Sequence, residues 1–157
     1  MRQATLCFLV REQKGENNEI CLAMKKRGFG KGRWNGVGGK VQESETIEEA
    51  AKRETFEEIG VTIQTMEKCA ELTFLFPHHP EWDQIVHVFL CRTWDGTPGE
   101  SEEMNPRWFR TKEIPFDSMW SDDSYWLPLI LQGKYLEGTF SFDEKDQLME
   151  HTISILP

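Results

Sequence analysis

Three acidic side chains crowd one short segment, RETFEEIG at residues 53–60, and their spacing could support chemistry. Glu54, Glu57 and Glu58 share an arc of about 100° on one face of a helix, because successive residues are about 100° apart around the axis. Glu54 and Glu58 form a like-charge pair four residues apart, which costs a helix about 0.2–0.5 kcal/mol. Glu57 and Glu58 also fall in the last turn, where the helix dipole disfavours negative charge. The arrangement therefore indicates either a solvated acidic face or a ligand that compensates the charge.

A hard divalent cation is the ligand that fits this pattern. Mg²⁺ prefers oxygen ligands and is usually bound by a few carboxylates together with substrate phosphates, and Mn²⁺ is an alternative at such sites. The segment RGFGKGRWNGVGGK, residues 27–40, holds six glycines in fourteen residues, which lets the backbone approach a metal and phosphates closely. The glycine-rich segment and the glutamates together predict a site for phosphate chemistry.

The elements that must position these groups are marked in the sequence. Thr46 and Glu49 have the spacing of a capping box and Gly60 is placed to end the helix, so the pattern predicts a helix at residues 47–59. Residues 121–133 begin with helix-capping types and predict a second helix, which Pro128 would strain. Strand-length runs occur at residues 4–10, 19–26, 69–76, 85–94, 106–110 and 138–142. Strands interleaved with two helices predict an α/β fold, a mixed β-sheet sandwiched between α-helices.

Composition limits the class of protein. The chain has 157 residues, 38% of them hydrophobic, so one domain spanning residues 1–157 is expected. A formal net charge of −9 argues against a duplex nucleic acid or an anionic membrane as partner, but a small anionic ligand fits if cations gather locally or a metal bridges the charges. The four cysteines are widely separated and indicate reduced thiols. No run approaches the roughly 18 apolar residues of a membrane span and no signal peptide is evident, so a cytoplasmic protein is expected.

The segment at residues 39–61, GKVQESETIEEAAKRETFEEIGV, resembles the signature of the Nudix hydrolases, the Nudix box. That signature combines a glycine, a glutamate six residues later, an Arg-Glu pair, a Glu-Glu pair and a final glycine at fixed spacing. Thr55 departs from the bulky aliphatic residue usual after the Arg-Glu pair, which bears on local packing and not on metal binding. The matching positions are Gly39, Glu45, Arg53, Glu54, Glu57, Glu58, Gly60 and Val61.

The resemblance extends to the animal MutT-type branch of that family, the hydrolases of oxidised purine nucleoside triphosphates. The segments MKKRGFGKGRWNGVGGKVQE, GTPGESEEM and FDSMWSDDSYWLPLILQ carry it, and a longer first loop around Gly15 to Asn18 is the main departure. The resemblance implies a monomer that hydrolyses 8-oxo-dGTP, and 2-oxo-dATP as well, to monophosphate and pyrophosphate, which sanitises the nucleotide pool. This resemblance is compatible with some of the protein being located in mitochondria or the nucleus, in addition to the cytoplasm.

The resemblance also implies roles at the phosphate end of the site. Glu54, Glu57, Glu58 and Glu103 are expected to bind Mg²⁺ and to activate water, with a carbonyl from Gly38 or Gly39 as a further ligand. Either Glu57 or Glu103 could accept the proton of the water, and the sequence does not decide between them. Glu45 and Arg53 are expected to serve the architecture of the loop and helix. Lys25 is expected to be the substrate-pocket lysine. The backbone expected along the phosphate path is that of Val37, Gly38, Gly39 and Lys40.

Base recognition is implied for Asn35 and for the segment WSDDS, with Ser121, Asp122 and Asp123. In an apolar pocket, the negative charge on one carboxyl disfavours ionisation of the adjacent carboxyl. One of the two would therefore stay neutral and donate a hydrogen bond to the purine oxygen, while the other accepts hydrogen bonds from N–H groups of the base. Such a pair could suit more than one oxidised purine. His78 and His79 are expected at the surface. The expected pocket walls and floor are Thr5, Phe29, Phe74, Phe76 and Trp120.

Three alternatives stay open at this point. A Nudix pyrophosphatase acting on another nucleoside diphosphate derivative would share the box but need a different base pocket. A non-catalytic nucleotide-sensing module would be expected to have lost glutamates of the box, and here all are present. An interaction protein that uses the aromatic surface would leave the cost of the like-charged glutamates unexplained.

Overall fold

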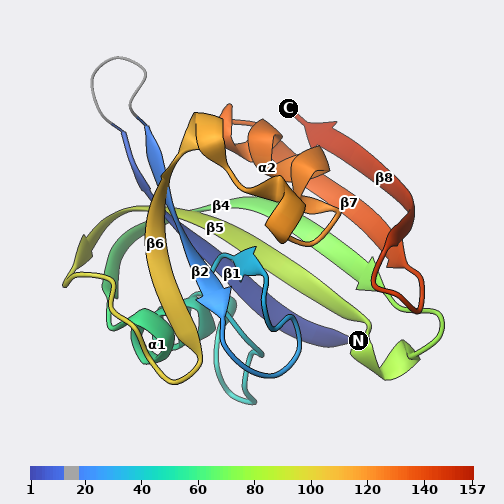
Figure 1. Ribbon diagram of the computed structural model, residues 1–157, viewed down its shortest axis with the longest axis horizontal. Coiled ribbons are helices and arrows are strands. Elements are labelled where there is room, and N and C mark those ends of the chain that lie inside the picture. Colours follow the sequence, from blue (N-terminus) through green and yellow to red (C-terminus); the bar gives the residue numbers. More distant parts are fainter. Residues whose placement is uncertain (13–17) are drawn as a thin grey trace.

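The fold is one mixed sheet with an α-helix on each side. Within residues 1–12 and 18–157, which the computed structural model describes, eight strands and two α-helices form (Figure 1). The strands are β1 (Arg2–Arg11), β2 (Glu19–Lys25), β3 (Trp34–Asn35), β4 (Thr62–Leu75), β5 (Gln84–Asp95), β6 (Met104–Arg110), β7 (Tyr135–Phe142) and β8 (Leu148–Leu156). The helices are α1 (Ile47–Ile59) and α2 (Asp123–Leu131), with short 3-10 turns at Pro80–Trp82, Thr111–Glu113 and Phe116–Ser118.

The order of the strands brings distant parts of the chain together. Neighbours in the sheet run β3-β2-β1-β5-β4-β7-β8, and β6 pairs with β2 outside this path. β1 is parallel to β5 and β4 is parallel to β7, whereas the remaining pairs are antiparallel. The predicted mixed sheet is therefore confirmed, and its centre joins β1 near the N-terminus to β5 and β4 from mid-chain.

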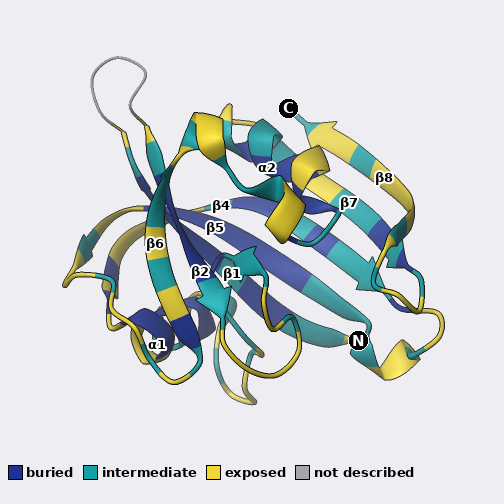
Figure 2. Cartoon of the chain, in the orientation of Figure 1, coloured by how far each residue is buried: buried dark blue, intermediate teal, exposed yellow. Residues whose placement is uncertain are grey.

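Two apolar cores cover the two faces of the sheet. Along β1, Phe8 and Val10 pack into the core that holds Trp126 and Leu127 of α2. Cys7 and Leu9, which alternate with them, pack into the core that holds Ala51 and Ile59 of α1. Because successive side chains of a strand point to opposite faces, α1 and α2 lie on opposite sides of β1. The buried middle of the sheet between exposed outer surfaces is visible in Figure 2.

The helix that carries the glutamates has the predicted ends. Thr46 Oγ1 accepts a hydrogen bond from the Glu49 backbone N–H at 3.1 Å, and Glu49 Oε1 accepts one from the Thr46 backbone N–H at 3.0 Å. Gly60 ends the helix in the left-handed conformation, with φ 73°, which glycine adopts without a Cβ clash. This capping box and C-terminal glycine confirm the predicted range 47–59.

Other elements differ from the sequence prediction. β4 begins at Thr62 and not near residue 69, and its register against β5 shifts at three places, which breaks the apolar alternation that would have revealed it. β8 was not predicted; it is an edge strand with mostly exposed side chains and is defined by its pairing with β7. β3 forms inside the predicted glycine-rich loop. Pro128 lies inside α2, which nevertheless continues to Leu131.

The first loop lies between the antiparallel strands β1 and β2. Most of the longer loop expected at Gly15 to Asn18 falls within residues 13–17, outside the described part of the chain. At its base, Arg11 Nη2 pairs with Glu19 Oε1 at 2.9 Å. Among the described residues, no helix has the length and apolar character needed to cross a membrane.

Candidate active site

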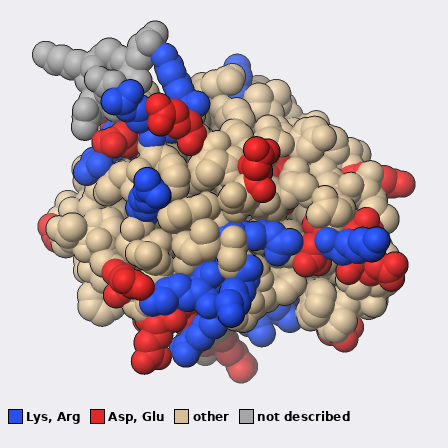
Figure 3. Space-filling model, viewed as in Figure 1, with Lys and Arg blue, Asp and Glu red and all other residues tan. Residues whose placement is uncertain are grey.

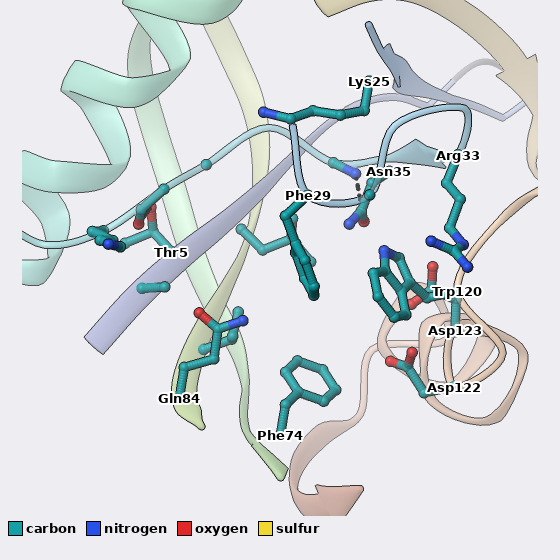
Figure 4. Close-up of a pocket in the computed structure, with 18 of the residues that line it drawn as sticks. Thr5, Lys25, Phe29, Arg33, Asn35, Phe74, Gln84, Trp120, Asp122 and Asp123 are labelled. Carbon is teal, nitrogen blue, oxygen red and sulfur yellow. Dashed lines mark hydrogen bonds between the residues drawn. The ribbon is translucent and has the colours of Figure 1, made fainter. Parts of the chain in front are cut away.

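A cavity of about 350 Å³ opens beside β1 and β2. Its walls come from β1, the β2–β3 loop, the glycine-rich segment, the adjoining ends of β4 and β5, the segment before α2 and the end of β7. Figure 4 shows side chains from these separate segments pointing into one space. The predicted residues that line it are Thr5, Lys25, Phe29, Asn35, Gly38, Gly39, Lys40, Phe74, Phe76, Trp120, Asp122 and Asp123.

Two buried carboxyls lie at one end of the cavity. Asp122 and Asp123 are each 2% exposed, and Asp122 Oδ2 accepts a hydrogen bond from Trp126 Nε1 at 2.7 Å. Burial raises the pKa of Asp122, while the Trp126 N–H opposes that shift. Burial and the adjacent Asp122 charge raise the pKa of Asp123 well above its usual range, and Asp123 Oδ2 has no partner among the described residues. Of the two carboxyls, Asp123 therefore holds a proton more readily, and Asp122 is the better hydrogen-bond acceptor.

Asn35 adds an amide to the same cavity. Its Oδ1 accepts a hydrogen bond from the Gly36 backbone N–H at 2.8 Å, the contact drawn in Figure 4. This contact fixes the orientation of the amide and leaves Nδ2 as the donor for a ligand. Partly buried Asn35 and the two buried aspartates together supply donors and acceptors suited to a planar polar ring.

Aromatic rings form the walls beside these polar groups. Phe29 lies 5.1 Å from Trp120 between ring centroids, at an interplanar angle of 32°. Phe76 and Phe142 stack on each other at 5.3 Å, and Phe142 meets Trp120 edge-on at 5.6 Å. Phe29 is 51% exposed, so one wall of the cavity borders solvent. The spacing of flat rings suits a flat aromatic ligand.

At the end of the cavity away from the aspartates, the glycine-rich segment packs closely against β1 and α1. The Thr5 backbone N–H donates to the Gly39 carbonyl at 2.9 Å, and Cys7 and Val37 exchange backbone hydrogen bonds at 2.6 and 3.0 Å. A Cβ at Gly38 would lie 1.8 Å from the Thr5 carbonyl oxygen, and one at Gly39 would lie 2.6 Å from the Glu54 carboxyl carbon. Gly38 therefore needs glycine, because a Cβ there would meet backbone, whereas a Cβ at Gly39 would displace the Glu54 carboxyl. The Gly39 carbonyl is engaged by Thr5, which leaves Gly38 as the better candidate for a carbonyl ligand.

The glutamates of α1 lie in different environments. Glu58 is 6% exposed, its Oε2 has no hydrogen-bond partner among the described residues, and burial with the nearby Glu54 charge raises its pKa to about 8. Lys25 and Glu103 are close enough to Glu58 to affect the same pKa in opposite directions. The Glu57 side chain is 56% exposed and pairs with Arg53 at 3.2 Å. The acidic cluster around Glu58 is thus Glu54, Glu58 and Glu103, of which Glu103 keeps 46% of its side chain exposed.

Arg53 organises the start of this cluster. Its Nε and Nη2 donate to both oxygens of Glu45 at 2.6 and 3.0 Å, and Nη2 also donates to the Lys40 carbonyl at 3.1 Å. Its Nη1 donates to Glu54 at 2.8 Å and to Glu57. These contacts tie the glycine-rich segment to α1 and give Glu45 and Arg53 the architectural role that was expected.

Cations gather locally despite the acidic total. Lys and Arg side chains are concentrated over the loop that joins β2 to β3 (Figure 3). Lys25 pairs with Glu103 at 3.4 Å and Lys26 with Glu100 at 2.6 Å, so this loop holds the acidic segment 100–103 in place. Glu103 is brought to the cluster by these ion pairs and by the adjoining β2–β6 pairing.

The cluster can be tested for its fit to a divalent cation. Among residues 1–12 and 18–157, no three Asp, Glu, His or Cys side chains already stand at metal-binding distance from a common point. Arg53 holds Glu54 and Glu57, so both carboxylates would have to shift partners to bind an ion. The unpartnered buried oxygen of Glu58 and the adjoining carboxylates nevertheless form a set of oxygen donors of the type that a hard divalent cation prefers.

Burial of Glu58 predicts a pH dependence of stability for the metal-free protein. The raised pKa means that the folded state binds this proton more tightly than the unfolded chain, so the stability it contributes is complete below about pH 4.5 and is lost as the pH rises through about 8. In EDTA at pH 9, Glu58→Gln should be more stable than wild type by on the order of 1–4 kcal/mol in urea unfolding. The difference should vanish near pH 4.5, and Glu48→Gln, an exposed glutamate of the same helix, should show none. Equal stability of wild type and Glu58→Gln at pH 9 would contradict the assignment.

Six predicted site residues do not line the cavity, and several lining residues were not predicted. The glutamates Glu54, Glu57 and Glu58 lie on α1 and Glu103 precedes β6, all outside the cavity lining. Val37, within the glycine-rich segment, is buried, and Ser121 Oγ accepts a hydrogen bond from the Leu148 backbone N–H at 3.0 Å. Arg33 could have been suggested by its place beside Asn35 in RWNG, whereas the strand pattern did not identify Gln84 or Phe142. The lining residues not predicted are Ala4, Leu6, Gly30, Arg33, Gly36, Gln84, Val86, Met104, Trp126 and Phe142.

Comparisons with known proteins agree with this geometry. The family model described as "NUDIX domain" matches residues 1–130. A mouse (Mus musculus) protein named oxidized purine nucleoside triphosphate hydrolase is 47% identical over 152 residues, 97% of this chain and 94% of the relative. A zebrafish (Danio rerio) protein of the same name is 48% identical over 134 residues, 85% of each chain. A solved mutator MutT protein from Bacillus halodurans superposes with a TM-score of 0.85 at 23% identity over 98% of each chain, a likeness of fold.

Proposed function

Because the chain belongs to the NUDIX domain family, we propose that it hydrolyses oxidised purine nucleoside triphosphates, 8-oxo-dGTP and 2-oxo-dATP among them, to monophosphate and pyrophosphate. The observation that carries this proposal is the buried pair Asp122 and Asp123, which lies with Asn35 in the same cavity as the glycine-rich segment. Figure 4 shows the aspartates at one end and Thr5 toward the other. A nucleotide can therefore place its base on the aspartates and extend its phosphates along the glycines. Such hydrolysis would remove oxidised purines from the nucleotide pool.

Base recognition rests on the unequal protonation of the two aspartates. Protonated Asp123 donates to the exocyclic oxygen of the purine, while ionised Asp122 accepts from ring and amino N–H groups. The Asn35 Nδ2 supplies a further donor, and the base stacks on Trp120. Since a proton can move between two adjacent carboxyls, the same pair can match purines that present donors and acceptors in different order.

The phosphate end uses the backbone of the glycine-rich segment and the charge of the side chains around it. Backbone N–H groups of Gly38, Gly39 and Lys40 line the phosphate path, and Lys25 offsets phosphate charge. Members of this family generally use a divalent metal, and Mg²⁺, with Mn²⁺ as an alternative, would be held by Glu54, Glu57, Glu58, Glu103 and the Gly38 carbonyl. When bound, the metal neutralises phosphate oxygens and acidifies water.

A carboxylate must accept the proton of the attacking water. Glu103 is better placed for this role than Glu57, because it lies beside Lys25 of the cavity wall, whereas Glu57 turns toward Arg53 and solvent. The same position keeps Glu103 close to Glu58. Water activation by Glu103 and binding of the cation chiefly by Glu54 and Glu58 is the division of roles that the contacts support.

The proposal is tested by pyrophosphate release in Mg²⁺ from 8-oxo-dGTP and, separately, from dGTP at low micromolar substrate. We expect a strong preference for 8-oxo-dGTP, because dGTP lacks the 8-oxo group and the changed N7–H that the polar end of the cavity can bind. The assay is repeated in EDTA, where activity should disappear. Equal turnover of both nucleotides, or turnover of neither, would contradict the proposed substrate class while leaving the family assignment intact.

A further inference from the structure

The β7–β8 hairpin, Tyr135–Phe142 and Leu148–Leu156, lies beyond residue 130, where the match to the family model ends. Its turn nevertheless reaches the base end of the cavity through three separate contacts. Phe142 meets the Trp120 ring edge-on, and the Leu148 backbone N–H donates to Ser121 Oγ. Asp146 Oδ2 lies 3.8 Å from Arg33 Nη2. The hairpin therefore contacts Trp120 and Ser121, which directly precede the two aspartates, and the Arg33 side chain beside them.

Arg33 covers one face of the Trp120 ring. The guanidinium carbon lies 4.2 Å from the ring centroid, a distance at which a cation is attracted to an aromatic face. In Figure 4, Trp120 lies between Arg33 and Phe29. Arg33 thus covers one face of the indole, and Phe29 packs toward the other, with its ring centroid 5.1 Å from that of Trp120. A base that stacks on this inner face takes the place of the Phe29 ring, which is 51% exposed.

Asp146 lies in a hydrogen-bonded turn that restricts the position of its carboxylate. It has φ 60°, in a tight turn where Asp143 Oδ1 accepts hydrogen bonds from the Lys145 and Gln147 backbone N–H groups at 2.8 and 3.0 Å. The Asp146 backbone N–H donates to the Asp143 carbonyl at 3.0 Å. The side chains of Arg33 and Asp146 are only 28% and 30% exposed, so their pairing is partly shielded from solvent. The Asp146 carboxylate therefore attracts the Arg33 guanidinium toward its place over the Trp120 ring.

We propose that the β7–β8 turn is a specificity element of this site: Asp146 orients Arg33, and Arg33 holds the Trp120 ring in the plane that stacks on the purine. Arg33 and Asp146 are positioning residues, because they act on the base through Trp120. This inference rests on the proposed function and deepens it. It assigns base affinity in part to a hairpin that lies outside the part of the chain matched by the family model.

The test measures binding of the product 8-oxo-dGMP by calorimetry in EDTA, so the base pocket is probed without the metal site. The variants are Asp146→Asn, Arg33→Met, Arg33→Lys and the double variant Asp146→Asn with Arg33→Met. Asparagine tolerates a positive φ and keeps the turn while removing the charge. Glu144→Gln is the matched control: it removes one negative charge from the same turn at an exposed side chain that forms no ion pair with the described residues.

We expect Asp146→Asn to weaken binding about 3-fold and Arg33→Met about 10-fold, in line with the loss of a partly shielded cation–π contact. Asp146→Asn should add nothing in the Arg33→Met background, because Asp146 acts through Arg33. Arg33→Lys should recover part of the affinity, since it keeps the cation but not the planar stack. Glu144→Gln should bind as wild type does. With 8-oxo-dGTP and Mg²⁺, KM should rise by the same factors while kcat changes less than about 2-fold.

The outcomes separate this inference from the function on which it rests. Wild-type affinity in both Asp146→Asn and Arg33→Met would overturn the inference alone, as would a fall in kcat at constant KM. Additive effects in the double variant would overturn the proposed action of Asp146 through Arg33. A wild-type protein that binds no 8-oxo-dGMP and hydrolyses no oxidised purine triphosphate would overturn the proposed function and the inference with it.

Discussion

Replacing Glu58 by glutamine is expected to lower kcat/KM for 8-oxo-dGTP by about 10³-fold, because the substitution removes a buried carboxylate whose charge the site needs for a divalent cation. Glu58 is nearly fully buried and its Oε2 has no partner among the described residues, so its charge serves no structural ion pair there. Glutamine has nearly the same shape, so the fold should persist. The measurement is steady-state pyrophosphate release in Mg²⁺, accompanied by melting temperature with and without Mg²⁺.

A control on the same helix distinguishes a catalytic from a general charge effect. Glu48→Gln removes one negative charge from an exposed position of α1 and should keep wild-type activity within about 2-fold. Mg²⁺ should raise the melting temperature of wild type and of Glu48→Gln more than that of Glu58→Gln. If Glu58→Gln hydrolysed 8-oxo-dGTP at the wild-type rate, Glu58 would have no place in the chemistry.

Replacing Asp122 by asparagine is expected to lower kcat/KM for 8-oxo-dGTP by about 100-fold or more. The variant loses the ionised acceptor that receives N–H groups of the base, and a buried donor left without its acceptor is costly. Trp126 Nε1 can still donate to the asparagine oxygen, so the packing of α2 should survive. Asp117→Asn, an exposed aspartate shortly before the same segment, is the matched control and should behave as wild type.

Asp123→Asn separates the two roles within the pair. An asparagine amide at this position can donate, as protonated Asp123 does, but it cannot give up a proton and become an acceptor. The variant should therefore lose about 10-fold or more in kcat/KM on at least one oxidised purine while retaining another, measured over 8-oxo-dGTP and 2-oxo-dATP. Full activity of Asp123→Asn on every oxidised purine tested would reject the proton-sharing account of base recognition.

Much of the chemistry was visible in the sequence because its signals are local. The helix 47–59 follows from a capping box, a C-terminal glycine and hydrogen bonds between residues four apart, and all of these lie within fifteen residues of chain. The cost of placing Glu54 and Glu58 together is likewise a property of that helix alone. The glycine-rich segment could be recognised from composition, and its two tightest approaches occur at Gly38 and Gly39.

Only the tertiary structure decided the walls of the cavity and the state of its charged groups. β8 exists because β7 pairs with it, and Gln84, Phe142 and Arg33 reach the cavity from strands and loops that are far apart in the chain. Glu54, Glu57 and Glu58 look equivalent in sequence, yet burial raises the pKa of Glu58, while Glu57 pairs with Arg53 and keeps 56% of its side chain exposed. Hydrogen bonding within a helix is set by near neighbours, whereas burial, desolvation and ion pairing depend on what the rest of the chain brings to the same place.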